Sequence, residues 1–345
     1  MKKKVLITGG AGFIGVNLAN HLLANTDNFV VIYDNLSRNG VEYNLEWLKS
    51  LKYKNMQFIK GDIRDYKKIK EVVKKCNEVY HLAAQVAVTS SVKEPVEDFE
   101  INATGTLYLL EAIRKQSPDA ILIFASTNKV YGELLHIKLK ECKTRYSFTG
   151  NLKGISENEN LDFHSPYGCS KGTADQYVRD YYRIYGLKTI VFRQSCIYGA
   201  HQYGNEDQGW VAHFVIKSLL NKKINLYGDG KQVRDLLEIR DLINAYLLAI
   251  NNIEKTKGEI YNIGGGIKNT FSLLELIEFL SKELRKDIDY KFFSWRPGDQ
   301  KIFISDNTKL IKHVHWQPRI SVKEGIKNLI GWAQENIELI KAINK

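Results

Sequence analysis

Short apolar runs alternate with amphipathic segments through the N-terminal part of the chain. The apolar runs have the length of buried strands, and they are residues 4–8, 29–33, 56–60, 78–82, 120–126 and 188–193. The segments between them are predicted to form helices, one ending near residue 25 and others at 66–76, 95–117 and 168–185. Strand–helix alternation of this spacing predicts a parallel sheet with helices on both faces.

The regular alternation ends near residue 200. Loops rich in Gly, Asp, Asn and Gln follow, interleaved with helical periodicity at 239–251, 272–286 and 322–341. Before that point, residues 133–164 form a long polar insertion, and insertions of that length beside a site are often functional.

We therefore predict an α/β chain with two parts. The first is a Rossmann-type, doubly wound parallel sheet formed by residues 1–199, whose last strand comes from about 236–265. The second is a smaller C-terminal α/β lobe, residues 200–345, which mainly binds substrate.

Composition places the chain among globular proteins. It has 345 residues and 44% hydrophobic content, enough for a large core. The formal net charge is +11, but the lysines are scattered along the chain. This pattern indicates a lysine-rich solvated surface with a mild attraction for acidic small molecules, and it predicts no nucleic-acid partner.

The sequence predicts neither a membrane-spanning segment nor a metal site. No stretch reaches the ~18–20 apolar residues that span a bilayer, and the first apolar run is too short for a signal-peptide core. We therefore predict a cytoplasmic protein without a membrane partner. Cys76, Cys142, Cys169 and Cys196 lack metal-ligand spacing, which predicts free thiols and no metal site.

A glycine-rich turn separates the first predicted strand from the first predicted helix. Its sequence, residues 9–15, is GGAGFIG. Glycines allow the backbone to turn tightly and approach a pyrophosphate, which sits where the N–H groups of the helix point outward. Asp34, at the end of the second strand, can bind ribose hydroxyls and repel a 2′-phosphate, which favours NAD. The nearby Arg38 keeps NADP as the alternative.

Tyr167 and Lys171 lie four residues apart on a predicted helix. Positions i and i+4 share a helix face, so both side chains can reach one pocket. A free tyrosine has a pKa of about 10, and a neighbouring ammonium group lowers it. Such a phenol can take a proton from a sugar hydroxyl while a nicotinamide accepts the hydride.

Several motifs, in this order along nearly the whole chain, resemble the extended short-chain dehydrogenase/reductases, in the branch of nucleotide-sugar epimerases and dehydratases. They lie at 8–15, 34–37, 61–63, 81–84, 102–106 and 167–171. Within that branch, segments 126–132, 161–172 and 206–211 are similar to the 2-epimerases of CDP-activated sugars. The resemblance implies an isomerase of surface-polysaccharide synthesis that interconverts CDP-paratose and CDP-tyvelose. Tightly held NAD oxidises C2, and the hydride returns on the opposite face.

The resemblance also implies the residues of the site. Tyr167 is the general base and acid, Lys171 lowers its pKa and binds the nicotinamide ribose, and Thr127 orients the reacting oxygen. The cofactor is held by Gly9, Gly12, Phe13, Ile14, Gly15, Asp34, Asn35, Ser37, Arg38, Asp62, Ile63, Leu82, Ala83, Ala84, Gln85, Asn102 and Ser126, together with Tyr167 and Lys171. The substrate is held by Gln85, Thr127, Asn128, Gln194, Gln208, Arg234, Arg296 and Asp299.

The two residues after Thr127 separate an epimerase from a dehydratase. The sugar 4,6-dehydratases of this family have an acid and a base there, usually Asp-Glu, whereas this chain has Asn128 and Lys129. An amide has no carboxyl proton to donate, and a lysine is a poor carboxylate substitute. We therefore expect a redox-only epimerisation.

Three alternatives stay open at this point: a UDP-sugar 4-epimerase, a 2-epimerase of another nucleotide sugar, and a non-catalytic NAD-sensing or nucleic-acid-binding protein. The family pattern also predicts a homodimer or homotetramer formed through helices near 103–116 and 168–185. We expect His81 to be a buried structural histidine, and His164 and His201 lie in loops near the site.

Overall fold

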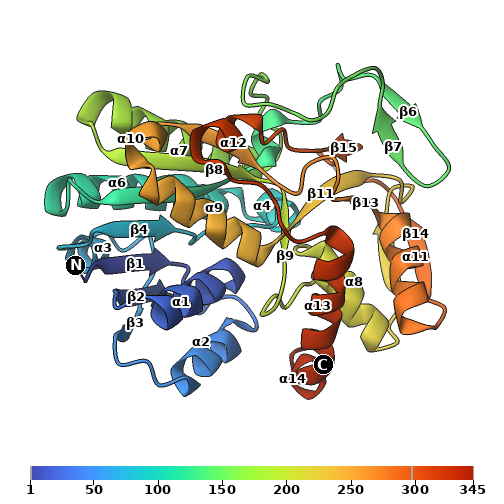
Figure 1. The fold of residues 1–345 in the computed structure, drawn as a ribbon, viewed down its shortest axis with the longest axis horizontal. Coiled ribbons are helices and arrows are strands. Elements are labelled where there is room, and N and C mark those ends of the chain that lie inside the picture. The colour runs from blue at the N-terminus through green and yellow to red at the C-terminus, as the bar shows by residue number, and fades with distance from the viewer. Residues whose placement is uncertain (1, 297, 345) are drawn as a thin grey trace. The chain divides into compact units, whose positions relative to one another are not determined.

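The structure is a computed structural model that describes residues 2–296 and 298–344. Pro297, next to the predicted substrate residue Arg296, lies outside the described residues. The chain divides into two compact units, and most of their helices and strands are labelled in Figure 1. Unit one comprises Met1–Thr127, Pro166–Arg193 and Ile243–Tyr261, and unit two comprises Asn128–Ser165, Gln194–Leu242 and Asn262–Lys345.

The sheet of unit one has seven strands in the order β12-β8-β5-β4-β1-β2-β3. Their bounds are β1 Lys4–Thr8, β2 Phe29–Asp34, β3 Met56–Lys60, β4 Glu78–His81, β5 Ile121–Thr127, β8 Lys188–Gln194 and β12 Ile260–Ile263. Strand β1 pairs in parallel with β2 and β4, β2 with β3, and β4 with β5. The chain thus builds outward from β1 to β3 and then returns to the other side of β1. The gap between β1 and β4 is the switch point where such folds bind ligands.

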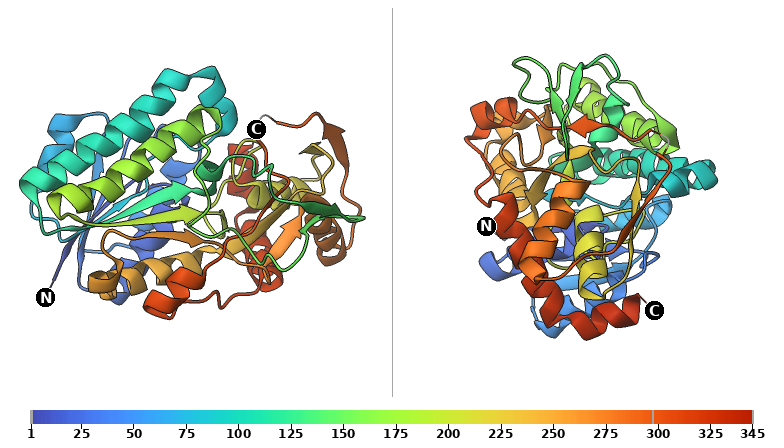
Figure 2. Two further views of the ribbon diagram at one scale, coloured as in Figure 1. Left: turned by 90° about the horizontal axis from the view of Figure 1, so that it is seen from above. Right: turned by 90° about the vertical axis from the view of Figure 1, so that its right-hand side faces the viewer.

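Helices cover both faces of this sheet, which confirms the predicted doubly wound α/β class. In the left view of Figure 2, α6 and α7 run side by side on one face, while α9 and α10 lie on the other. The helices are α1 Phe13–Asn25, α2 Val41–Ser50, α3 Tyr66–Val72, α4 Val88–Lys93, α5 Pro95–Phe99, α6 Gly105–Gln116, α7 Ser165–Tyr185, α9 Ile239–Asn251 and α10 Ile253–Thr256.

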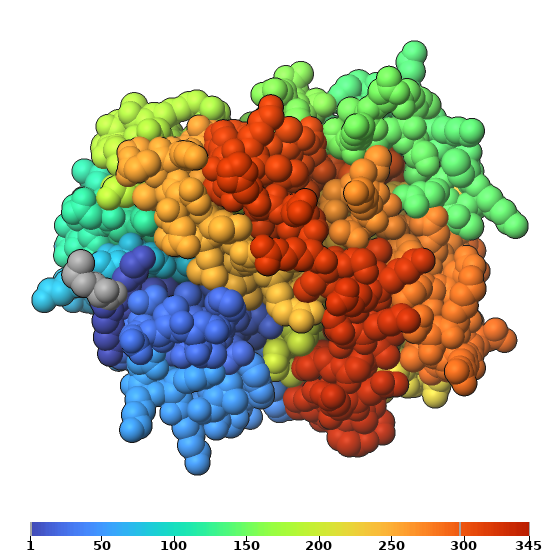
Figure 3. Space-filling model, viewed as in Figure 1, coloured from blue at the N-terminus to red at the C-terminus, as the bar shows by residue number. Residues whose placement is uncertain are grey.

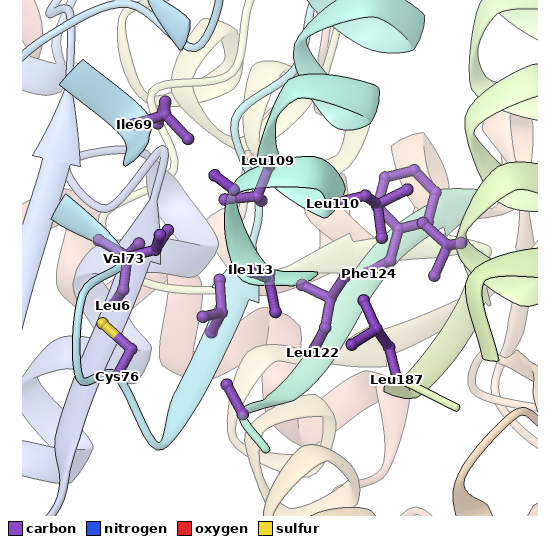
Figure 4. Packing of buried hydrophobic residues seen from close by; sticks show 14 of the residues in the cluster. Leu6, Ile69, Val73, Cys76, Leu109, Leu110, Ile113, Leu122, Phe124 and Leu187 are labelled. Carbon is purple, nitrogen blue, oxygen red and sulfur yellow. The ribbon is translucent and has the colours of Figure 1, made fainter. Parts of the chain in front are cut away.

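A continuous apolar core joins the sheet to α3 and α6 (Figure 4). The strands contribute Leu6 and Phe124, and α6 contributes Leu109 and Ile113, all fully buried. Leu109 and Ile113 are four residues apart and so share one helix face. Burying each such side chain stabilises the fold by about 1.5–3 kcal/mol.

The single helix predicted at 95–117 is interrupted in the structure. Helix α5 begins at Pro95, and the π-helix η1 Glu100–Thr104 separates α5 from α6. Proline suits a helix start because its missing N–H would have no partner there. A π-turn inserts one residue without ending the helix, so hydrophobic periodicity does not reveal it.

Unit two contains short strands and packed helices. Strand β11 pairs in parallel with β9 and β15 and antiparallel with β13, β10 pairs with β14, and β6 with β7. The strands are β6 Leu139–Glu141, β7 Tyr146–Phe148, β9 Cys196–Tyr198, β10 Ile224–Tyr227, β11 Val233–Glu238, β13 Thr270–Ser272, β14 Tyr290–Phe293 and β15 Ile302–Phe303. The helices are η2 Asn128–Tyr131 (3-10), α8 Trp210–Leu219, α11 Leu273–Leu284, α12 Thr308–Val314, α13 Val322–Glu335 and α14 Ile337–Ile343.

The core of unit two forms between α8, α11 and α13. Val215, Leu276 and Leu329 are buried in it. The outer side of α13 and α14 forms part of the surface seen in Figure 3, in red. The helical periodicity at 322–341 therefore corresponds to two helices, which meet at Asn336.

The insertion at 133–164 has more structure than its sequence indicates. It contains the hairpin β6–β7, and Tyr146 donates its N–H to the carbonyl of Lys231. Ile155 donates to the carbonyl of Ile304 and accepts from the N–H of Asp306. Backbone bonds to distant segments of unit two thus order this stretch, and no local periodicity predicts them.

Candidate active site

The glycines of the turn after β1 allow other backbone segments to lie very close to it. Gly9 has a φ of +68°, and a Cβ at this position would lie 2.6 Å from the nitrogen of Ala83. A Cβ on Gly15 would lie 2.4 Å from the oxygen of Gly9. Helix α1 then starts at Phe13 with no side-chain cap and no acidic residue in its first turn. Its N–H groups and the positive end of its dipole therefore fit an anionic diphosphate.

Asp34 ends β2 beside this turn. Its carboxylate accepts hydrogen bonds from the N–H groups of Ala11 (3.1 Å) and Leu36 (2.8 Å). Burial raises the pKa of Asp34, and these backbone hydrogen bonds act in the opposite direction. A half-buried acceptor fixed at this place fits the hydroxyls of a ribose.

The other predicted adenosine residues follow β2 and β3. Asn35 donates to Asp62 at 3.0 Å, and Arg64 binds the same carboxylate with two nitrogens at 2.9 Å. The hydrogen bond from Arg64 lowers the pKa of Asp62 to about 2. Ile63 belongs to the apolar core. Ser37 is exposed and Arg38 half-buried.

His81 is a buried structural residue that connects β1 to α6. Its Nδ1 lies 2.7 Å from Oγ1 of Thr8, and its Nε2 lies 3.0 Å from Oγ1 of Thr106. Thr106 donates its own proton to the carbonyl of Asn102, so it accepts from Nε2–H and leaves Nδ1 to accept from Thr8. Burial lowers the pKa of His81 to about 3, so the ring is neutral.

Asn102 fastens the loop that follows β4. It lies in the π-turn, accepts from the N–H of Gln85 at 3.0 Å and donates to the carbonyl of Gln85 at 3.0 Å. The adjoining residues Leu82, Ala83 and Ala84 are half-buried. The predicted cofactor residues after β1, β2, β3 and β4 thus lie at the carboxyl edge of one sheet in unit one.

Thr127, Tyr167 and Lys171 also lie in unit one, at the end of β5 and on one face of α7. Each is at least nine-tenths buried. Burial raises the pKa of Tyr167 to about 12, and a side-chain hydrogen bond with Thr127 acts in the opposite direction. The net effect is opposite to the lowering predicted from the sequence, so the phenol carries its proton at neutral pH.

The ammonium group of Lys171 lies close to the C-terminal end of β5. Its ammonium donates to the carbonyl of Ala125 at 2.6 Å and lies 4.1 Å from the ring centre of Phe124. Burial lowers its pKa to about 7, against the opposing effects of Asp175 and Asp98. Predicted cofactor residue Ser126 donates to Asp175 at 2.7 Å.

Unit two contains a basic cluster around one carboxylate. Arg234, on β11, binds Asp299 at 2.7 Å, and the Lys129 ammonium lies 3.7 Å from the same carboxylate. Lys129 also donates to the carbonyl of Gly298 at 3.0 Å. Two cations around one anion leave positive charge, and an arginine fork suits a diphosphate. The contribution of Lys129 to this cluster was not predicted from the sequence, in which this residue served only to exclude a dehydratase.

Arg296 lies beside an aromatic ring in unit two. Its guanidinium is 3.8 Å from the ring centre of Tyr227, and it donates to the carbonyl of Glu206 at 3.0 Å. Asn128 donates to Gln300 at 3.0 Å. Gln194 is buried and Gln208 half-buried. His164 pairs with Glu133, and burial lowers the pKa of His201 to about 4.

Residues 2–296 and 298–344 contain neither a metal-binding cluster nor a membrane-spanning helix. Within these ranges no cluster of three His, Cys, Asp or Glu side chains could hold a metal ion. None of the helices described there is long and apolar enough to cross a membrane. The four cysteines are free thiols, as predicted.

Comparison with known proteins identifies the family. Residues 6–329 match the family model described as GDP-mannose 4,6 dehydratase. The chain is 45% identical to the CDP-paratose 2-epimerase of Salmonella typhi over 95% of this chain and 98% of that protein.

Two solved structures have the same fold over nearly their whole length. The UDP-glucose 4-epimerase of Thermotoga maritima, solved with UDP-glucose, has a TM-score of 0.82 and 32% identity, covering 97% of this chain and 99% of that one. The dTDP-glucose 4,6-dehydratase DesIV of Streptomyces venezuelae, solved with NAD and TYD, has a TM-score of 0.85 and 27% identity, covering 99% of both chains. The chain therefore belongs to the GDP-mannose 4,6-dehydratase family of extended short-chain dehydrogenase/reductases.

Proposed function

We propose that the protein is an NAD-dependent isomerase that interconverts CDP-paratose and CDP-tyvelose by inverting C2 of the sugar. The observation that carries the proposal is the 45% identity to a CDP-paratose 2-epimerase over almost the full length of both chains. The proposal includes the cytoplasmic location and the role in surface polysaccharide (O-antigen) synthesis that the family resemblance implies.

NAD is the proposed cofactor. When bound, it supplies the hydride acceptor and donor for the sugar. Gly9, Gly12 and Gly15 give the diphosphate close access to the backbone, and Asp34 accepts from the adenosine ribose. The related DesIV was solved with NAD, which supports the choice over NADP.

Tyr167 is the proposed proton carrier. Its phenol starts protonated because burial raises its pKa to about 12. The hydrogen bond with Thr127 favours the phenolate, and a positive charge on Lys171 would favour it further. Tyr167 can then take the proton of the C2 hydroxyl and later return it, while Thr127 orients that oxygen.

The residues after Thr127 argue against water elimination. The amide of Asn128 is bound to Gln300, and an amide cannot protonate a leaving hydroxyl. Lys129 lies beside Asp299, and its side chain has no carboxylate that could act as the base of an elimination. We therefore propose a redox-only epimerisation for this chain, without the elimination of water.

The nucleotide end of the substrate is assigned to the basic cluster of unit two. Arg234 and Arg296 bind the diphosphate, and Asp299 holds Arg234 in place. Gln85, Asn128, Gln194 and Gln208 are proposed to face the sugar and its nucleotide.

We also propose a homodimer, or a dimer of dimers, formed through α6 and α7. Helix α7 exposes Tyr177, Ile184 and Tyr185, with relative exposures of 46%, 66% and 50%. Covering such side chains with the same helices of a second copy would remove apolar surface from water.

Product analysis separates the proposal from its alternative. The purified protein is incubated with CDP-paratose and, separately, with UDP-glucose, without added NAD, and the sugar ring protons are followed by NMR. Inversion at C2 of the CDP-sugar supports both the reaction and a retained cofactor. Inversion at C4 of UDP-glucose alone would favour a UDP-sugar 4-epimerase, as in the T. maritima relative.

A further inference from the structure

A buried carboxylate lies beside the proposed catalytic pair without a role in the reaction described so far. Asp98, on α5, is 1% exposed. Ser170 donates its hydroxyl to Oδ2 of Asp98 at 2.5 Å, and Gln85 donates its amide to Oδ1 at 2.8 Å. Asn102 donates to Oδ1 at 3.2 Å. All three partners are donors, which is the arrangement that a charged carboxylate requires.

These bonds reach α7 at the turn between Tyr167 and Lys171. Ser170 precedes Lys171 by one residue, and its hydroxyl also lies 3.0 Å from the amide of Asn102. The first turn of α7 has a second attachment, because Tyr167 donates its N–H to Oγ of Ser91 at 3.1 Å. The start of α7 is therefore fastened by side chains from α4, α5 and η1.

Asp98 and Asn102 can both take part because they are four residues apart and so share one face of the helical stretch. Asp98 lies in α5, and Asn102 lies in η1, which begins just after α5. π-turns of this kind are frequent at functional sites. Asn102 thus binds Gln85 in the loop after β4 with both its oxygen and its nitrogen, and the same nitrogen lies 3.2 Å from Asp98 and 3.0 Å from Ser170.

Resting on the proposed function, we propose that Asp98 is a positioning residue for the reaction, which fixes Tyr167 and Lys171 against the loop that follows β4. The cluster of Gln85, Asp98, Asn102 and Ser170 is called the Asp98 network below. Through this network, the loop after β4 and the start of α7 keep a fixed position relative to each other.

The negative charge of Asp98 also acts on both members of the pair. It raises the pKa of Lys171 against the larger lowering caused by burial, and it adds to the burial that raises the pKa of Tyr167. The other charged group that faces Lys171 is Asp175, on α7, while His81, on β4, is neutral. Removing the charge of Asp98 should therefore lower both pKa values.

The test measures Lys171 directly and needs no substrate. The ε-carbon signal of Lys171 in ¹³C-lysine-labelled holoenzyme is assigned with Lys171→Met and titrated by NMR. In Asp98→Asn the midpoint should fall by at least about half a pH unit. Glu97→Gln is the matched control, since it removes an exposed charge from the same helix. It should leave the midpoint unchanged.

Ser170→Ala separates positioning from charge. It keeps the carboxylate and removes its link to α7, so the Lys171 midpoint should stay in place while kcat falls about tenfold at unchanged KM. A Lys171 midpoint equal in Asp98→Asn and wild type would overturn the charge effect, and an unchanged kcat in Ser170→Ala would overturn the positioning role. If Asp98→Asn fails to fold, the kcat of Ser170→Ala alone tests the positioning role of the network. Absence of turnover in wild type would contradict the proposed function and leave the titration interpretable.

Discussion

The cofactor residues of unit one and the basic cluster of unit two are organised differently. In unit one, the glycine turn follows β1, while Asp34 and Thr127 are the last residues of β2 and β5 in the same parallel sheet, so a short stretch of sequence places each of them. In unit two, Lys129, Arg234 and Asp299 come from three distant segments and meet only after the short strands and loops have folded. A repeating sheet makes a site readable from sequence, whereas a site assembled from loops depends on long-range contacts.

Tyr167→Phe should have the largest effect on turnover. The variant removes the proton carrier and keeps the ring, so kcat should fall at least about 10³-fold, within the range for general acid–base catalysis. NAD content after purification should stay that of wild type. Tyr290→Phe on β14 is the control, because Tyr290 is exposed and lies outside the proposed site and dimer interface. Activity close to wild type in Tyr167→Phe would remove the assignment.

Gly15→Ala tests the turn of unit one. The added Cβ would lie 2.4 Å from the oxygen of Gly9 and 2.6 Å from Cα of Gly10, both backbone atoms that cannot move aside cheaply. We expect loss of most bound NAD, measured by absorbance after denaturation. Gly331→Ala in α13 is the control, since nothing lies within 4 Å of its added Cβ. Full NAD occupancy in Gly15→Ala would show that the turn does not hold the diphosphate.

Arg234→Lys tests the cluster of unit two. It keeps the charge and removes the fork, so KM for the nucleotide sugar should rise about 10-fold or more, with a smaller change in kcat. Bound NAD should be unaffected, in contrast to Gly15→Ala. Arg240→Lys is the control, because Arg240 is exposed and pairs only locally with Glu238. An unchanged KM in Arg234→Lys would separate this cluster from substrate binding.

Because the pKa of the buried His81 is lowered, we expect the stability of the protein to depend modestly on pH. Its folded-state pKa of about 3 lies below the value of about 6.5 of an unfolded histidine, so the unfolded state binds the proton first. Its contribution to stability is therefore present above about pH 6.5 and is lost progressively as the pH falls towards 3.

Thermal unfolding measures this effect. The fall in Tm from pH 7 to pH 5 should be smaller in His81→Gln than in wild type. Parallel Tm curves for wild type and His81→Gln would contradict the assignment.

The sequence predicted the α/β class because apolar strands and glycine turns are local signals. The fold class and the family are confirmed, and the predicted strands at 4–8 and 56–60 coincide with β1 and β3. The π-turn at η1 and the Asp98 network were not predicted, because a π-turn leaves no periodic signal and an acidic residue in a helix usually indicates solvent. The cluster around Asp299 was predicted only in part, since the contribution of Lys129 depends on the tertiary fold.

We propose that the chain inverts C2 of the sugar by removing a hydride and returning it on the opposite face. The most direct measurement is the conversion of CDP-paratose in D₂O, with the product examined by ¹H NMR and mass spectrometry. We expect CDP-tyvelose that carries no deuterium at C2, because the hydrogen returns from the cofactor and not from solvent. Deuterium at C2, or a failure to invert that carbon, would contradict it.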